Sequence, residues 1–262
     1  MKKLPIGIST FEHIIKENYV YVDKTKEAFN LIDNGKFYFL SRPRRFGKSL
    51  FLDTLRNIFE GKKELFEGLY IYDKWDWSKK YPVIRISFND GNFKSVEGLN
   101  KTIYQILDFN QRYLQVECPK DFDMPGCFKR LIEEAYYKYN QKVVILIDEY
   151  DKPILDNIEN PELAKEMRDE LKTFYAVIKG ADEYVRFAFM TGVSKFSKVS
   201  LFSGLNNLDD ITINPNYATI CGYTHKDLET VFAEHLKGQD YEKIRRWYNG
   251  YKWLGEPVYN PF

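Results

Sequence analysis

Residues 36–59 read KFYFLSRPRRFGKSLFLDTLRNIF, and this stretch decides the fold. It begins with a mostly apolar run at residues 36–40, which predicts a buried strand. It ends with apolar residues at nearly helical spacing over residues 48–59, which predicts a helix. The loop between them ends in Gly47, Lys48 and Ser49. A strand, a loop ending in GKS and a helix together are the setting that a phosphate-binding loop requires.

The start of this loop departs from the usual pattern. Phosphate-binding loops normally open with glycine, whereas Arg42 and Pro43 occupy that place here. The alternative is therefore a basic surface loop that ends in GKS by chance. As a phosphate site, the helix N-terminus would present N–H groups and the positive end of its dipole. Lys48 would reach the β- and γ-phosphate oxygens, Gly47 would let the backbone turn close to the ligand, and Ser49 would offer its hydroxyl to Mg²⁺.

A second motif lies about 100 residues further along, where residues 143–149 read VVILIDE. The continuous apolar run predicts a central parallel strand that is covered on both faces. Asp148 and Glu149 would then face the crevice where open α/β sheets bind ligands, and two carboxylates there are costly without a cation. We expect Asp148 to hold Mg²⁺ through water, and Glu149 to orient and deprotonate an attacking water. The alternative is an ordinary acidic turn after a strand.

A third candidate follows the strand predicted at residues 185–190. Thr191 comes directly after this strand and is the candidate sensor of the γ-phosphate, with Ser194 as the second choice. The alternative is an ordinary strand end with Gly192 as its turn.

The remaining elements alternate between strand and helix. Strands are predicted at residues 83–88 and, more weakly, at 210–213, and helices at 99–114, 127–139 and 163–179, the last after a start signal at Pro161. This alternation predicts an α/β fold with a parallel sheet and flanking helices.

The pattern changes after residue 221. A helix that follows Thr224 and runs to Leu236, with Asp227 in a capping box, and a second helix at about 241–248 are predicted. We therefore divide the chain into a core at residues 1–221 and a small helical, lid-like subdomain at 222–262. The strand-like end at 258–262 suggests truncation of a longer protein.

Composition limits the classes of partner. The net charge of +1 gives no overall argument for binding nucleic acid or a membrane. No apolar run reaches the ~18–20 residues that span a bilayer, and the N-terminus lacks the pattern of a signal peptide. The scattered cysteines, Cys118, Cys127 and Cys221, predict neither a disulfide framework nor a metal cluster and favour a reducing cytoplasm.

Several short motifs carry a resemblance over nearly the whole chain. They are LPIG (4–7), YVDKT (21–25), RPRRFGKS (42–49), YPV (81–83), LIDEYDKP (146–153), TGVSK (191–195), SGLNNL (203–208), YNGY (248–251) and YNPF (259–262). With them the chain resembles the predicted AAA-ATPase-like family of bacteria and archaea, whose members often carry a C-terminal nuclease-like domain of the PD-(D/E)XK superfamily.

The resemblance implies a P-loop NTPase fold of the ASCE type, with a Walker A loop at 42–49, a Walker B strand at 143–149, and ATP and Mg²⁺ as cofactors. It also implies that Arg42 belongs to the family's own variant of the loop. A nuclease-like domain or another protein is then the expected partner. In related ATPases the segment before the first strand packs on the adenine, which here indicates Tyr21 and Val22; simple packing of that segment is the alternative.

We therefore predict an ATP-binding, Mg²⁺-dependent ATPase that forms ADP and phosphate and acts as a nucleotide-controlled switch. Its catalytic residues would be Lys48, Glu149 and Thr191, and its metal ligands Ser49 and Asp148. Its nucleotide contacts would be Tyr21, Val22, Arg44, Arg45, Phe46, Gly47, Lys48, Ser49 and Leu50. A transition-state arginine would be Arg44, Arg45 or Arg186, or would come from a neighbouring subunit.

Two other functions stay open at this point. One is a nucleotide-dependent interaction or regulatory module with negligible turnover. The other is a nucleic-acid-binding component of a defence or mobile-element system, which would use basic loops such as Arg42, Arg44 and Arg45. The oligomeric state stays open as well.

Overall fold

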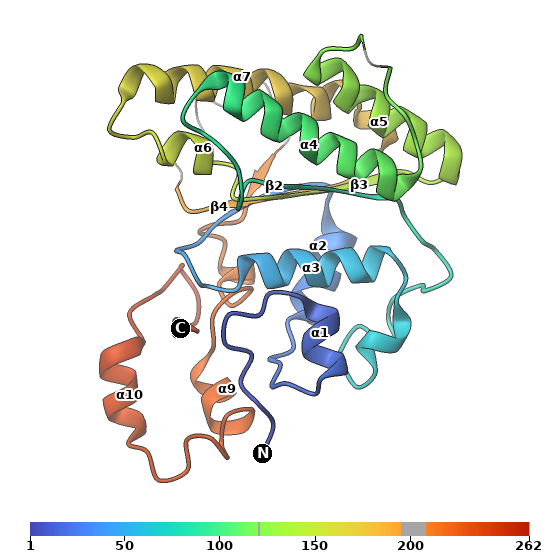
Figure 1. The fold of residues 1–262 in the computed structure, drawn as a ribbon. Coiled ribbons are helices and arrows are strands. Elements are labelled where there is room, and N and C mark those ends of the chain that lie inside the picture. Colours follow the sequence, from blue (N-terminus) through green and yellow to red (C-terminus); the bar gives the residue numbers. More distant parts are fainter. Residues whose placement is uncertain (120, 195–207, 262) are drawn as a thin grey trace. The chain divides into compact units, whose positions relative to one another are not determined.

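The computed structural model describes residues 1–119, 121–194 and 208–261 (Figure 1). Lys195, residues 203–207 and Phe262, which carry part of the resemblance, lie outside the described residues. The chain forms two compact units. The first unit comprises residues 1–35, 42–79 and 210–262, and the second unit comprises residues 36–41 and 80–209. Each unit is described by itself.

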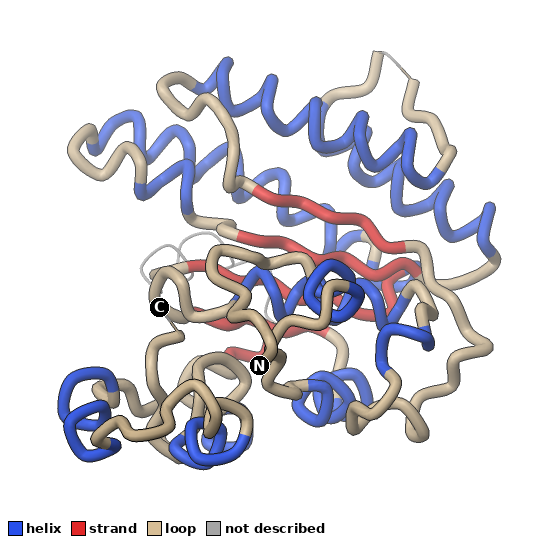
Figure 2. The backbone as a smooth tube through the Cα atoms, turned by 60° about the horizontal axis from the view of Figure 1, so that its bottom comes forward, coloured by secondary structure: helices blue, strands red, loops and turns tan. Residues whose placement is uncertain are grey.

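A parallel sheet forms the centre of the second unit. Its long strands are β1 (Phe37–Ser41), β2 (Val83–Ser87), β3 (Val143–Asp148) and β4 (Val185–Gly192). They lie side by side (Figure 2) in the order β2-β3-β4-β1-β5, where β5 is the short Asp209–Asp210. The pairs β2–β3, β3–β4 and β1–β4 are all parallel. The predicted α/β fold with a parallel sheet is confirmed, although the fifth strand is only two residues long.

Burial explains why these segments are strands. All residues of β1 and β3 are buried, so both faces of these strands are covered and their sequences are continuous runs instead of alternating ones. β4 pairs with β1 on one side and with β3 on the other. The strand that precedes the GKS loop and the strand that ends in Asp148 are therefore both neighbours of the strand that carries Thr191.

Three long helices cover one face of this sheet (Figure 1). They begin earlier than predicted because a polar side chain caps each first turn: Ser95, Asp123 and Asn160 accept hydrogen bonds from the backbone N–H groups of Gly98, Gly126 and Leu163. Among the described residues of this unit, the helical elements are α4 (Val96–Leu114), α5 (Met124–Tyr139), α6 (Lys152–Leu155), α7 (Pro161–Gly180) and the 3₁₀ turn η2 (Asp182–Tyr184).

The first unit consists of helices joined by long loops. α3 and α10 have the predicted bounds. The predicted capping box of Thr224 and Asp227 is present, but the helix that follows it ends at Thr230 and does not reach Leu236. The sequence analysis did not predict α1 and α2. A distant contact fixes α1: the Phe11 N–H donates to Asp53 Oδ2 at 2.8 Å. The elements are α1 (Phe11–Lys16), α2 (Thr25–Asn34), α3 (Lys48–Phe59), η1 (Lys63–Phe66), η3 (Pro215–Tyr217), α9 (His225–Thr230) and α10 (Tyr241–Tyr248).

In the part of the chain that the structure describes, every helix is too short or too polar to cross a membrane.

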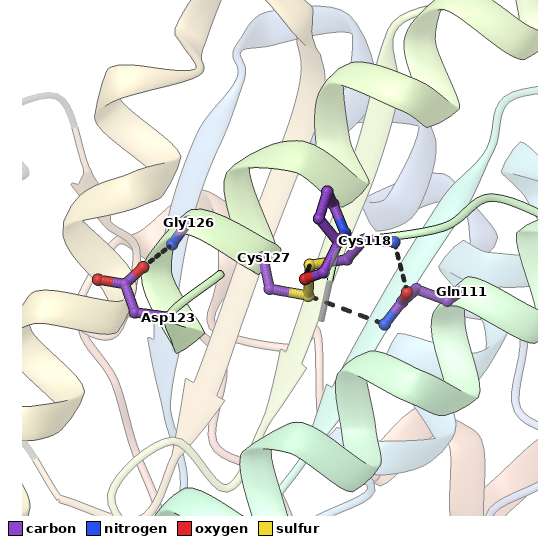
Figure 3. Close-up of a disulfide and its surroundings, with 6 residues drawn as sticks. Gln111, Cys118, Asp123, Gly126 and Cys127 are labelled. Carbon is purple, nitrogen blue, oxygen red and sulfur yellow. Dashed lines mark hydrogen bonds between the residues drawn. A yellow bond between two sulfur atoms is a disulfide. The ribbon is translucent and has the colours of Figure 1, made fainter. Parts of the chain in front are cut away.

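One sequence prediction about the cysteines was wrong. Cys118 and Cys127 form a disulfide between the loop after α4 and the first turn of α5 (Figure 3). The turn between the two helices brings the Cα atoms to 5.4 Å, which spacing along the chain alone did not reveal. Gln111 braces this region, because its Oε1 accepts the Cys118 N–H at 2.7 Å. Cys221 is a buried free thiol, and burial raises its pKa.

Candidate functional site

The loop between β1 and α3 has the backbone of a tight turn. Gly47 is the N-cap residue of α3 and has a φ of +91°, in the left-handed region that glycine adopts without strain. Since glycine has no side chain to cap the helix, the first turn of α3 gains no side-chain cap there. Arg45 is also left-handed, with a φ of +66°, which is uncommon for a residue with a side chain. The predicted turn at Gly47 is confirmed, whereas the turn at Arg45 was missed.

Lys48 lies across the start of its own loop. Its side chain is buried, and its Nζ donates to the carbonyl oxygens of Arg42 at 3.1 Å and Pro43 at 3.0 Å. Leu50 and Ser49 are half-buried on the same turn of α3, and Arg44 and Arg45 are exposed. Six consecutive positions, 44–49, therefore carry a lysine ammonium, a serine hydroxyl and two exposed guanidinium groups.

Arg42 is a buried anchor of the first unit. Its side chain is 1% exposed, its Nη1 donates to Thr212 O at 2.8 Å, and its Nη2 donates to Tyr217 O at 3.3 Å. The guanidinium also lies over the Trp253 ring, 3.9 Å from the centroid. Burial lowers the pKa of Arg42 to about 10, so the group is still charged at neutral pH. The alternative in which Arg42 contacts a polyanion is not supported, because its guanidinium is buried and faces the interior.

Phe46 gives the loop a second anchor. Its buried ring lies edge-on to the rings of Tyr251 and Trp253, with centroids 4.7 and 5.2 Å away. Its carbonyl oxygen accepts the Gly222 N–H at 3.2 Å. We call Arg42, Phe46, Tyr251 and Trp253 the loop clasp. The sequence offered one signal for it, since an apolar phenylalanine in a basic loop needs a partner.

At the carboxyl end of β3, two acidic residues follow each other as predicted. Asp148 is buried and is paired in register with Ser87 of β2. Glu149 has a φ of +51°, and its N–H donates to Asp148 Oδ1 at 3.0 Å. A left-handed backbone at a non-glycine residue is a strained conformation of the kind that clusters at functional sites.

Asn89 is a neighbour of Glu149 that the sequence analysis missed. In the amide orientation that satisfies its surroundings, its nitrogen donates to both carboxylate oxygens of Glu149 at 3.0 Å, and its oxygen accepts from Ser87 Oγ at 3.1 Å. The available signal was position: Asn89 follows β2, the strand next to β3. Its amide therefore restrains the carboxylate that was predicted to act as a base.

The end of β4 carries two buried hydroxyl groups. Thr191 is fully buried and is paired in register with Leu40 of β1. Thr191 Oγ1 and Ser194 Oγ have no hydrogen-bond partner among the residues that the structure describes. Buried hydroxyls are nearly always hydrogen-bonded, so this pair fits contact with a ligand or an ordered water.

The segment after β3 holds the segment after β4. The Asp151 carboxylate is buried, and its Oδ2 accepts the N–H groups of Val193 at 3.1 Å and Ser194 at 2.7 Å. The Tyr150 hydroxyl donates to Ser194 O at 2.8 Å, and the Tyr150 N–H donates to Thr191 O at 3.2 Å. Asp148, Glu149, Thr191 and Ser194 therefore belong to two neighbouring strand ends that contact each other directly.

Other predicted residues lie elsewhere. The Tyr21 ring packs edge-on against Phe11, and burial raises the pKa of its hydroxyl. Val22 belongs to a small apolar cluster with Leu228, Phe232 and Tyr259. Both residues make packing contacts, and their role as adenine contacts stays a prediction.

Arg186 is a poor candidate for the transition-state arginine in cis. It is the second residue of β4, five residues before Thr191. At a rise of about 3.3 Å per residue, Arg186 lies about 16 Å along the strand from Thr191. We therefore set this candidate aside.

Comparison with known proteins supports a family assignment. A family model described as "Predicted AAA-ATPase" matches residues 5–202. A curated relative, the "Uncharacterized protein in vnfD 5'region" of Azotobacter chroococcum mcd 1, is 54% identical over 262 residues. The alignment covers 100% of this chain and 51% of the relative, so the chain spans about half the length of that protein. Together with the GKS loop and the parallel sheet, these matches show that the chain belongs to the predicted AAA-ATPase family, a family that indicates nucleotide binding.

Proposed function

We propose that the protein binds ATP with Mg²⁺, hydrolyses it to ADP and phosphate, and acts as a nucleotide-controlled switch. The observation that carries this proposal is the strand order. β4 lies between β1, which runs into the GKS loop, and β3, which ends in Asp148. In open parallel sheets, ligands bind outside the carboxyl ends of the strands.

The residues fit a nucleotide in their chemistry. Lys48 and the backbone N–H groups of residues 45–49 are the proposed phosphate donors, and the φ of Gly47 lets the backbone turn there. Ser49 and Asp148 are the proposed Mg²⁺ ligands, since Mg²⁺ prefers oxygen ligands and neutralises phosphate charge when bound. Thr191 Oγ1 is a buried donor that a phosphate oxygen would satisfy. Binding through Lys48 would exchange its hydrogen bonds to Arg42 and Pro43 for bonds to phosphate.

For hydrolysis, we propose that Glu149 takes a proton from the attacking water. Its backbone strain and its contact with Asn89 support a position that is set in advance. The exposed Arg44 and Arg45 stay candidates for stabilising the transition state, as does an arginine from a neighbouring subunit.

For the switch, we propose that residues 222–262 act as a lid that responds to the nucleotide. The loop clasp supports this idea, because Phe46 and Arg42 of the loop contact Tyr251 and Trp253 within the first unit. Tyr21 and Val22 stay our proposed adenine contacts. A nuclease-like domain or another protein is the proposed partner.

A second candidate is a nucleotide-dependent interaction module with negligible turnover. The contact of Asn89 with both oxygens of Glu149 favours it, since a carboxylate engaged in this way is a weaker base. The two candidates share the binding site and differ only in the hydrolysis step.

Binding is tested by thermal shift with ATP and Mg²⁺. Wild type should gain stability with increasing ATP, and Lys48→Ala should lose this shift. Lys16→Ala is the matched control, since Lys16 is an exposed lysine whose side chain pairs with Glu12 on α1. No shift in wild type would exclude both nucleotide functions, and a full shift in Lys48→Ala would show that the phosphate site is elsewhere.

Hydrolysis is tested by phosphate release. Glu149→Gln should lower the rate about 100-fold while ATP still binds, because a positioned base contributes roughly this much. Glu159→Gln, an exposed glutamate beyond α6, is the control. Equal background rates in wild type and Glu149→Gln would leave the interaction module as the function.

A further inference from the structure

Asp151 has an unusual set of hydrogen bonds for its position. It is the N-cap residue of α6, where an aspartate normally caps the helix with its side chain. Its side chain makes no such bond. The carboxylate instead accepts the N–H groups of Val193 and Ser194, 42 and 43 residues further along the chain. The carboxylate therefore binds the segment after β4 and does not cap the N-terminus of its own helix.

The contact is close and buried. A Cβ atom added to Gly192 would lie 2.5 Å from Asp151 Oδ1 and would also meet the Tyr150 ring, so only glycine fits between these two residues and the chain. The Asp151 side chain is 1% exposed. A buried carboxylate is costly unless hydrogen bonds compensate it, and here two consecutive backbone N–H groups do so.

The held segment contains both of the buried hydroxyls. Thr191 lies one residue before Gly192, and Ser194 is itself one of the two residues whose N–H groups bind Asp151. The backbone conformation at Val193 and Ser194 decides where the Ser194 hydroxyl points, and it limits movement of Thr191 at the strand end. Glu149 lies two residues before Asp151, so the same short segment carries the proposed base.

We propose that Asp151 is a positioning residue: it ties the end of β4 to the residues after β3, so that the hydroxyls of Thr191 and Ser194 are presented to the phosphate in a fixed relation to Glu149. This inference rests on the proposed ATPase function. Asp151 itself would touch neither nucleotide nor water, and would act only through the backbone of residues 192–194.

The first test needs no nucleotide. Amide hydrogen exchange at Val193 and Ser194, measured by NMR, should be about 10-fold faster or more in Asp151→Ala than in wild type, because the acceptor is gone. Asp151→Asn keeps one acceptor oxygen and should give an intermediate rate. Asp156→Ala, a nearby acidic residue that pairs with Lys152, is the control and should leave both amides unchanged. Unchanged exchange in both Asp151 variants would overturn the proposal.

The second test separates positioning from binding. Phosphate release at saturating ATP should fall about 10- to 100-fold in Asp151→Ala, the loss expected for a misplaced catalytic group, while the ATP concentration that gives half the thermal shift changes less than about 3-fold. In a Thr191→Val, Ser194→Ala background, Asp151→Ala should add little, because the two hydroxyls through which Asp151 is proposed to act are already absent. If the Asp151 loss multiplies with the loss of that background, Asp151 does not act through these hydroxyls.

The outcomes keep this inference distinct from the proposed function. Wild type without ATP-dependent phosphate release would overturn the ATPase function and this inference with it. Wild-type turnover that is preserved in Asp151→Ala would overturn this inference alone. If Asp151→Ala shows no cooperative unfolding transition, the folded Asp151→Asn variant decides by the same two measurements.

Discussion

The GKS loop of the first unit and the end of β4 in the second unit are held in opposite ways. In the loop clasp, a buried cation, Arg42, donates to carbonyl oxygens 170 and 175 residues away and lies over an aromatic ring. At the end of β4, a buried anion, Asp151, accepts backbone N–H groups only 42 and 43 residues away. One irregular segment is held by positive charge and the other by negative charge.

The difference teaches that backbone groups can compensate buried charges of either sign. The cations Arg42 and Lys48 are satisfied by carbonyl oxygens, so their positive charge is not neutralised by a carboxylate in these contacts. The anion Asp151 accepts hydrogen bonds from backbone amides, so in these contacts it is not paired with a lysine or an arginine. In both regions, backbone dipoles therefore compensate a buried charge.

The largest expected effect is on the loop clasp. Arg42→Ala should lower the free energy of unfolding by about 3 kcal/mol, because it leaves a cavity beside Trp253 and leaves the carbonyl groups of Thr212 and Tyr217 without this donor. Urea denaturation measures the change. The control Arg44→Ala, at an exposed position of the same loop, should stay within about 0.5 kcal/mol of wild type. Equal losses in the two variants would show that Arg42 is no anchor.

Two glycine-to-alanine substitutions test how tightly the loop clasp is packed. Gly222→Ala should cost about 2 kcal/mol, because its φ is +85° and a Cβ atom there would lie 2.8 Å from Phe46 Cε1. Gly238→Ala should cost about 1 kcal/mol, since its φ is +81° but nothing lies within 4 Å of the added atom. The difference between the two free energies measures the close contacts of the added atom with Phe46, the Tyr259 carbonyl oxygen and Val258. No difference would argue against tight packing of that ring.

In the second unit, removal of the Tyr150 hydroxyl should lower the free energy of unfolding by a smaller amount. Tyr150→Phe removes the hydrogen bond to Ser194 O and should cost about 1 kcal/mol. Tyr104→Phe, at a residue that is 44% exposed on α4, should cost nothing measurable. If Tyr150→Phe also matches wild type in denaturation, the end of β4 is held by Asp151 without help from the tyrosine.

The smallest expected effect on the free energy of unfolding is that of the Glu12 carboxylate, which lies outside both regions. The pKa of Glu12 is lowered chiefly by its hydrogen bond to Lys16, and also by Lys62. The carboxylate therefore contributes stability above its ordinary pKa of 4.5, and this contribution disappears as the pH falls through the lowered value. Glu12→Gln should cost less than about 0.5 kcal/mol at pH 7 and nothing at pH 2, as denaturation at the two pH values would show. A larger loss at pH 2 than at pH 7 would contradict this sign.

Much of the sheet and of the candidate site was predictable because its signals are local. The bounds of α3 follow from helical spacing within twelve residues, and β3 follows from one continuous apolar run that ends in Asp148 and Glu149. The turn at Gly47 follows from the only residue type that enters the left-handed region freely. Parallel strands place their carboxyl ends at one edge, so the neighbourhood of Thr191 and Asp148 also followed from topology.

Only the tertiary structure decided the partners of buried polar groups. From the sequence, Arg42 was a candidate surface charge, and Asp151 was an ordinary residue after the acidic pair. Cys118 and Cys127 were expected to be unpaired thiols. The roles of these residues depend on Thr212, Val193, Ser194 and the turn between α4 and α5, which lie at separations that no local pattern encodes. The physical reason is that a buried charge must find its compensating dipoles wherever folding brings them, while periodicity reports only which face of an element is buried.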